Sequence, residues 1–164
     1  MRAANAVEST RSAARLCCGV LVGIALTVLV LELALRGLDG PEYTRVRRAE
    51  FGPFSWFIGA AFTAAFVTSV LLVVHTHRAH SRVFRPAAIA LALLLLAVVV
   101  TITVNGPINF EQQSWNATAP PPTWEQVRDR WQIAHAVRTA ALVLALAFLN
   151  TPSKHAQETP QHSA

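Results

Sequence analysis

Four long blocks of apolar residues constrain the fold of this chain more than any other feature of its sequence. They cover residues 16–35, 54–74, 86–104 and 131–149, and the first continues to about residue 38. A helix needs roughly 20 residues to cross the hydrocarbon core of a bilayer. Open strands and irregular loops are excluded at that depth because their backbone polar groups would lack partners. The blocks therefore predict an all-α fold, a four-helix transmembrane bundle with a membrane domain at about residues 16–150.

The composition favours a membrane protein over a soluble one. Only 14% of the residues are charged and 53% are hydrophobic, whereas a soluble globular domain carries about 25% charged residues. Buried helices of a soluble core would give apolar runs of about 10–14 residues. The first block is also longer than the apolar region of a signal peptide, about 7–15 residues, so we expect it to remain as a span. Membrane lipid is then the first expected partner, and the expected location is the cell membrane.

The basic residues indicate an orientation in the membrane. The net charge of +5 comes from arginines at the ends of the spans, without a basic stripe or base-stacking motif, so no nucleic-acid partner is expected. Lys and Arg concentrate in cytoplasmic loops, and the segment 75–85 is basic with no acidic residue. We therefore place both termini on the cytoplasmic side, with residues 1–15 as an N-terminal cytoplasmic segment. The polar tail, 151–164, is expected to be disordered.

Two of the connections between spans carry turn signals. Asp39–Pro53 opens with Asp-Gly-Pro and has mixed charge, so a loop is expected. Asn105–Arg130 opens with Asn-Gly-Pro, which should end the third helix because a residue before proline avoids the helical region. Within the spans, Gly19 and Gly23 predict a face on which helices pack closely, and the chain could form a homo-oligomer.

A polar stripe runs along the fourth span. Its members are spaced three and four residues apart, which places them on one helical face: Arg128, Trp131, His135, Arg138 and Leu142. Arg138 would lie roughly 10 Å inside the span, and an unpaired arginine there costs about 2.5–3.5 kcal/mol. Glu32, at a similar depth in the first span, is its predicted partner, although Glu32 could instead pair with Arg36 along its own helix. The two charges would either clamp two helices together or belong to a functional site.

Other polar and aromatic residues gather at the same end of the predicted bundle. All four tryptophans lie there, at positions 56, 115, 124 and 131. An aromatic belt normally decorates both interfaces, so a one-sided set favours a pocket. Asn105 and Asn109 would either cap the end of the third helix or donate hydrogen bonds inside a cavity.

Two further groups of residues resemble metal or redox motifs but lack the required pattern. His75, His77 and His80 lie at the opposite end without convergent ligands, so a basic patch facing lipid headgroups is expected and no metal site is predicted. Cys17 and Cys18 are the only cysteines, and adjacent cysteines imply no disulfide framework.

The third loop and the fourth span carry a family resemblance. The run Asn105-Gly-Pro-Ile-Asn109, then Trp115, then Arg128-x-x-Trp131-x-x-x-His135-x-x-Arg138 resembles the anthrone-oxygenase-like family. These are small four-helix membrane proteins, many of them known only as a domain of unknown function. The resemblance extends over about residues 16–150. It implies oxidation of a polycyclic anthrone to an anthraquinone by dioxygen, without a cofactor.

The resemblance also suggests roles for individual residues. His135 would be a general base, and Arg138 or the two asparagines would stabilise an enolate, with Glu32 as the third catalytic residue. The predicted substrate-binding residues are Asn105, Asn109, Trp115, Arg128 and Trp131, and the tryptophans would stack on flat rings. Asn105, Asn109, Trp131, His135 and Arg138 are expected to line one cavity. The alternative function is a non-catalytic membrane protein, such as a transporter subunit or a partner-binding bundle.

Overall fold

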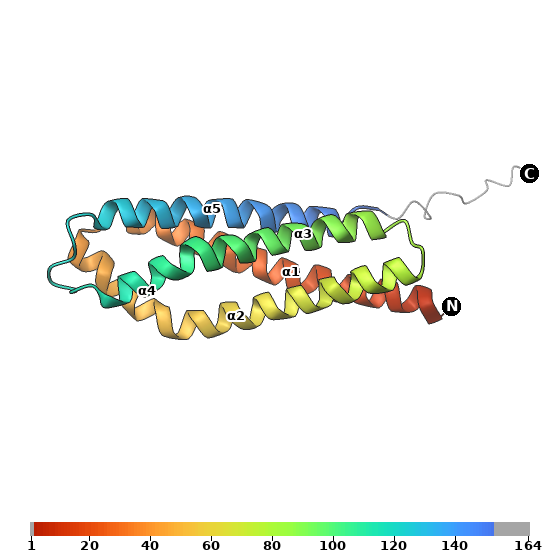
Figure 1. Cartoon of the computed structure of the whole chain (residues 1–164). Coiled ribbons are helices and arrows are strands. Elements are labelled where there is room, and N and C mark those ends of the chain that lie inside the picture. The colour runs from red at the N-terminus through yellow and green to blue at the C-terminus, as the bar shows by residue number, and fades with distance from the viewer. Residues whose placement is uncertain (1, 153–164) are drawn as a thin grey trace, which may run out of the picture.

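The computed structural model of the chain describes residues 2–152 and is helical almost throughout (Figure 1). The elements are α1 (Arg2–Leu35), α2 (Gly40–Arg78), α3 (Phe84–Val100), the π-helix η1 (Thr101–Asn105), α4 (Gly106–Ser114) and α5 (Trp124–Leu149). The predicted all-α bundle is confirmed. From residue 153 on, the predicted polar tail lies outside the described residues.

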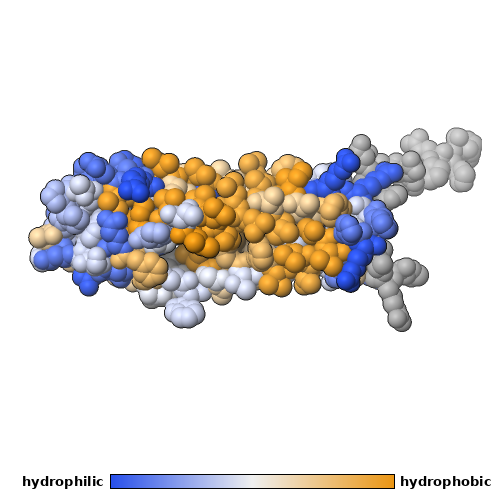
Figure 2. Space-filling view, viewed as in Figure 1, coloured by the Kyte–Doolittle hydropathy of each residue, from blue (hydrophilic) through white to orange (hydrophobic). Residues whose placement is uncertain are grey.

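Four helical stretches are long and apolar enough to cross a membrane: Asn5–Leu35, Ser55–Arg78, Phe84–Ser114 and Trp124–Leu149. Three of them contain a predicted block, and Ser55–Arg78 contains the fourth block apart from its first residue, 54. The stretches run alternately up and down, so that α1 begins and α5 ends at the same end of the bundle (Figure 1). Side chains near the start of α1 hold the end of α5, since Nε of Arg11 and Nε of Arg15 both donate to the carbonyl of Leu149, at 3.1 and 3.0 Å. On the face shown in Figure 2, apolar residues cover the middle of the bundle and hydrophilic residues lie at both ends.

The segment 39–53 is helical, and the prediction of a loop there was wrong. The side chain of Asp39 accepts a hydrogen bond from the backbone N–H of Glu42 at 2.8 Å, and Pro41 occupies the first turn. An aspartate cap followed by proline is a strong helix start. Asp-Gly-Pro therefore begins α2. The mixed charge that suggested a loop belongs to a helix with one buried and one exposed face.

The third span also continues where the sequence predicted its end. After Val100 the backbone widens into η1, where the N–H of Gly106 reaches the carbonyl of Thr101, and α4 then runs on to Ser114. A proline in a regular helix clashes with the carbonyl four residues earlier. The wider π turn relieves that constraint at Pro107, and such turns are frequent at functional sites.

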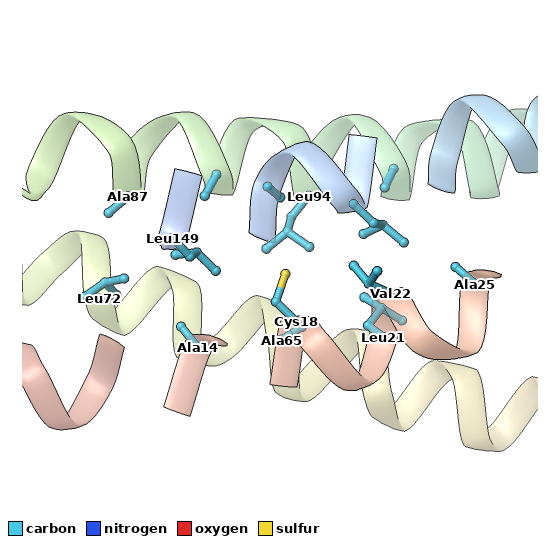
Figure 3. Close-up of a cluster of buried hydrophobic side chains, with 14 residues drawn as sticks. Ala14, Cys18, Leu21, Val22, Ala25, Ala65, Leu72, Ala87, Leu94 and Leu149 are labelled. Atoms are coloured by element: carbon cyan, nitrogen blue, oxygen red, sulfur yellow. The ribbon is translucent and has the colours of Figure 1, made fainter. Parts of the chain in front are cut away.

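The half of the bundle nearest the termini is a tightly packed apolar core (Figure 3). Small side chains bring the helices together, among them Ala14, Cys18, Ala65 and Ala87. Such residues let helices approach closely where lipid gives no hydrophobic drive for association. The helices of this chain do not use the predicted packing face at Gly19 and Gly23, because a Cβ at either position would meet no atom within 4 Å. For contacts with a second copy of the chain, this face stays a prediction.

Candidate functional site

Buried polar side chains collect at the end of the bundle opposite the termini. They come from α1, α2, the α3–α4 stretch and α5, and each exposes less than a tenth of its surface: Glu32, Arg47, Asn105, Gln112, Arg128, Gln132, His135 and Arg138. An apolar cluster that includes Tyr43, Ile108, Trp115 and Trp131 lies beside them. Buried charges in a membrane protein are expensive and usually functional, so this cluster is the candidate site.

Arg47 on α2 is the centre of the polar network. Its Nη1 donates to Oε1 of Glu32 at 2.8 Å and to Oε2 of Glu50 at 3.3 Å. Its Nε donates to Oε1 of Gln112 at 3.0 Å, and its Nη2 donates to Oδ1 of Asn109 at 2.9 Å. The guanidinium also lies 4.3 Å from the centroid of the Trp131 ring, a cation–π distance. One side chain thus ties α1, α2, α4 and α5 together.

The predicted ion pair between Glu32 and Arg138 was wrong. Glu32 is 1% exposed and pairs with Arg47, while its second oxygen accepts from Nε2 of Gln132 at 3.1 Å. The alternative partner is also excluded, because Arg36 pairs with Asp129 at 3.2 Å. Matched depth along two spans suggested Arg138, but the helical start of α2 brings a closer arginine to the carboxylate.

Arg138 and His135 form a second buried pair. Nη2 of Arg138 donates to Nδ1 of His135, and Nη1 donates to Oγ1 of Thr101 at 3.2 Å. Because a guanidinium has no acceptor, Nδ1 must accept and Nε2 must carry the proton. Nε2 then donates to the carbonyl of Ala25 at 2.9 Å. His135 is therefore neutral, with both ring nitrogens engaged, and its ring stacks on Trp131 with centroids 5.0 Å apart.

The two asparagines connect the broken third span to α5. Asn105 donates from Nδ2 to the carbonyl of Trp131 at 3.1 Å, and Oδ1 of Asn109 accepts from Nε1 of Trp131 at 2.7 Å. Neither caps a helix end, since no side-chain cap bond forms at Asn105. Together they fix the backbone and the ring of Trp131.

A cavity of about 410 Å³ lies between α2 and the α3–α4 stretch, where the space-filling view is hollowed (Figure 2). Its polar wall consists mainly of Arg47, Glu50, Asn109, Gln112, Gln113 and Arg138. Its apolar wall includes Phe51, Ile58, Phe62, Val98, Ile102, Phe110 and Trp131. Two donors at this cavity, Nε of Arg138 and Nε2 of Gln112, have no partner among the described residues. An apolar pocket with a few polar groups is the usual form of a small-molecule site.

The predicted site residues fall into three groups according to their position relative to the cavity. Asn109, Trp131 and Arg138 line it, whereas Asn105, His135 and Glu32 lie behind its wall and hold wall residues in place. Trp115 and Arg128 are buried outside it. Arg128 bonds Asp129 and lies over Trp124, and Trp115 packs in the apolar cluster.

Of the six polar wall residues named above, sequence reasoning missed four: Arg47, Glu50, Gln112 and Gln113. Arg47 and Glu50 are three residues apart, on one face of a helix, a pattern that becomes visible only when residues 40–53 are recognised as helical. Burial raises the pKa of Glu50, the charge of Arg47 opposes that shift, and the charge of Glu32 adds to it. Burial likewise raises the pKa of Tyr43.

At the opposite end, a second cavity lies over the turn between α2 and α3. Its wall includes His77, His80, Arg82 and Arg85. Within residues 2–152 no group of three or more His, Cys, Asp or Glu side chains is arranged to hold a metal ion. Both cysteines are free, as expected.

Comparison with known proteins gives one match. No curated protein and no solved structure matches this chain. A family model described as anthrone oxygenase matches residues 43–148, which is more than half of the 164 residues. The match begins at Tyr43, so it includes the whole cavity wall of α2, α4 and α5 but not Glu32. The chain belongs to the anthrone oxygenase family.

Proposed function

We propose that this membrane protein is an oxygenase that converts a flat, lipophilic, anthrone-like substrate into a quinone with dioxygen. The cavity between α2 and the α3–α4 stretch carries the proposal. Its aromatic walls suit fused rings, and Nε of Arg138 and Nε2 of Gln112 are buried donors without partners. A buried donor left unsatisfied costs about 1–3 kcal/mol, so an acceptor such as a carbonyl oxygen would be stabilised there.

The position of the cavity suits a substrate that dissolves in lipid. Its wall includes Ile102 and Phe110, which are 67% and 69% exposed on the apolar surface of the bundle. Phe57, 57% exposed, lies one residue from the cavity-lining Ile58. A polycyclic molecule could therefore enter sideways from the bilayer, with its rings between α2 and the α3–α4 stretch and its oxygen toward the polar wall.

The proposed reaction balances with dioxygen as the only co-substrate. An anthrone carries an acidic C–H group opposite a carbonyl, and removal of that proton places the electron pair on the ring system and the carbonyl oxygen. The carbanion combines with dioxygen, the peroxide takes up a proton, and loss of water gives the quinone. Anthrone and dioxygen thus yield anthraquinone and water. Because the substrate carbanion itself reduces dioxygen, we propose that no cofactor takes part.

Two donors are proposed to stabilise the oxyanion. Donors that are already oriented toward a developing charge in a low-dielectric site lower the barrier strongly. Arg138 is oriented by His135 and Thr101, and Gln112 is oriented by Arg47. For His135 we propose a positioning role, because acting as a base would require it to give up its bond to Arg138.

Oxygen consumption tests the proposal. The purified protein in detergent micelles is mixed with anthrone, and oxygen uptake and quinone absorbance are recorded against protein-free micelles. Arg138→Gln should reduce kcat/KM by about 10²–10³, the effect of removing one oxyanion donor. Arg45→Gln is the control, because Arg45 is exposed on α2 and does not line the cavity. No uptake above background with anthrones or hydroquinones would favour a non-catalytic membrane protein.

The orientation of the chain is a separate proposal. We propose a plasma-membrane location. The end of the bundle at which α1 begins and α5 ends would lie on the cytoplasmic side. Reporter fusions within the α4–α5 connection should report the outer side, and fusions at Ser81 should report the cytoplasmic side. The reverse result would place the mouth of the site in the cytoplasmic half of the membrane.

A further inference from the structure

We propose that Glu50 is the base that removes the substrate's acidic proton. This inference rests on the oxygenase function proposed above and identifies the group that begins the reaction. It replaces the sequence-based assignment of that role to His135.

The cavity wall offers only one group with the required chemistry. Among the described residues that line it, Glu50 is the only carboxyl, and no His, Cys, Tyr or Lys accompanies it. The other ionisable groups of the wall are Arg47 and Arg138, which only donate. His135 is fully buried behind the wall, with both nitrogens in hydrogen bonds. Among the described residues of the cavity wall, Glu50 is therefore the one base that can take up a proton from a bound molecule.

The partners of Glu50 leave it free to act. Oε2 accepts from Nη1 of Arg47 at 3.3 Å, and Oε1 accepts no hydrogen bond from the described residues. Arg47 makes its shorter ion pair, 2.8 Å, with Glu32. When Glu50 takes up a proton, Arg47 therefore keeps a carboxylate partner and the network stays intact.

The charges of the site are suited to moving one negative charge across the cavity. The charged groups that act on Glu50 are Glu32 from α1 and Arg47 from its own helix. Arg138 lines the same cavity from α5, and α4 contributes the amides of Gln112 and Gln113. Before the reaction, two carboxylates balance two guanidinium groups. Proton transfer neutralises Glu50 and places the charge on the substrate oxygen, beside Arg138. The net charge is unchanged, so no ion has to enter the low-dielectric cavity.

Glu50 then acts twice in a balanced sequence. Its carboxylate takes a proton from the C–H group, and the electron pair becomes the enolate. After a C–O bond has formed with dioxygen, the protonated Glu50 returns its proton to the terminal peroxide oxygen. The carboxylate next removes the remaining hydrogen on that carbon, the O–O bond breaks, and hydroxide leaves and takes up the proton as water.

Hydrogen exchange isolates the first step from the chemistry of oxygen. Anthrone is incubated with the protein in micelles in D₂O without oxygen, and deuterium uptake is followed by mass spectrometry against protein-free micelles. The wild type should accelerate exchange. Glu50→Gln should reduce both the exchange rate and kcat by a factor of about 10²–10⁴, the usual contribution of a general base. Quenching of tryptophan fluorescence by anthraquinone should show unchanged binding. Glu42→Gln is the matched control, since Glu42 is exposed on the same helix.

The pH profile provides a second measurement. A base must be ionised, so the exchange rate should fall as the pH drops through the pKa of Glu50, at a midpoint above the ordinary value of 4.5. Glu50→Gln should lack this acidic limb of the profile, the fall in exchange rate at low pH. If that variant fails to fold, Glu50→Asp should keep the limb at a lower rate.

The outcomes separate the two proposals. Exchange in Glu50→Gln as fast as in the wild type, or a limb that persists in that variant, overturns the assignment of Glu50. Accelerated exchange that Glu50→Gln loses, without any oxygen uptake by the wild type, would support Glu50 as a base and contradict the oxygenase function. Wild-type oxygen uptake without accelerated exchange would support an oxygenase and overturn the base.

Discussion

Arg47 and Glu32 form a buried ion pair, with 2.8 Å between Nη1 and Oε1 and side-chain exposures of 9% and 1%. The pair joins the C-terminal end of α1 to a part of α2 that precedes its apolar stretch. Three further acceptors surround the guanidinium, on Glu50, Asn109 and Gln112. A charge desolvated to this degree is stable only with such a set of partners. The pair therefore fixes one wall of the cavity as well as the helices.

Breaking this pair should destabilise the protein strongly. Glu32→Ala or Arg47→Ala should each cost about 3–5 kcal/mol, because each leaves an uncompensated buried charge. The double variant should lose less than the sum of the two, a coupling that a double-mutant cycle measures. Thermal unfolding in detergent is the readout. Arg45→Ala, at an exposed position of α2, should change the free energy of unfolding by no more than about 0.5 kcal/mol. Strict additivity at Glu32 and Arg47 would show that the two do not interact.

Variants of His135 should distinguish a positioning residue from a base. His135→Asn keeps an oxygen near the position of Nδ1 and can still accept from Arg138, whereas His135→Ala cannot. We expect His135→Asn to keep much more of kcat/KM than His135→Ala, because the orientation of Arg138 is what matters. Steady-state oxygen uptake with anthrone measures both. Equal and complete loss in the two variants would return the role of base to His135.

Gly106 should be required for the π-helix. A Cβ at this position would lie 3.0 Å from the carbonyl oxygen of Thr101, which is backbone and cannot move freely. Gly106→Ala should therefore lower the free energy of unfolding by about 1 kcal/mol or more, the size of typical backbone-strain effects. It should also shift Thr101 away from Arg138. Thermal unfolding checks this against Gly23→Ala, where a Cβ meets nothing and alanine should be neutral or stabilising because it favours helix.

Gly59 offers a way to fill the cavity without disturbing the fold. It lines the cavity, and a Cβ there would meet no atom within 4 Å. Gly59→Leu should raise KM for anthrone while leaving the melting temperature unchanged, because the side chain occupies substrate space. Ala60→Leu is the matched control, because Ala60 is the next residue on the same helix, exposed and outside the cavity wall. An equal rise of KM in both variants would argue against this cavity as the binding site.

The sequence by itself determined the number of spans, because the thickness of the bilayer, and not the neighbouring helices, sets the length and hydropathy that a span requires. It also placed the polar residues of α5 on one face, since helical spacing is a local property. The family resemblance from Asn105 to Arg138 came from the same stretch. These features need no knowledge of how the helices pack.

Only the tertiary structure decided which charges meet and which residues line the cavity. Arg47, Glu32 and Gln112 lie on three different elements, so no spacing along the chain relates them. The helical state of residues 40–53 depends on the burial of Tyr43 and Arg47 against α4 and α5, a gain that the local turn signal of Asp39-Gly40-Pro41 does not reveal. The position of His135 behind the wall and of Glu50 in it follows from helix rotation, which packing sets because every buried charge must find a partner.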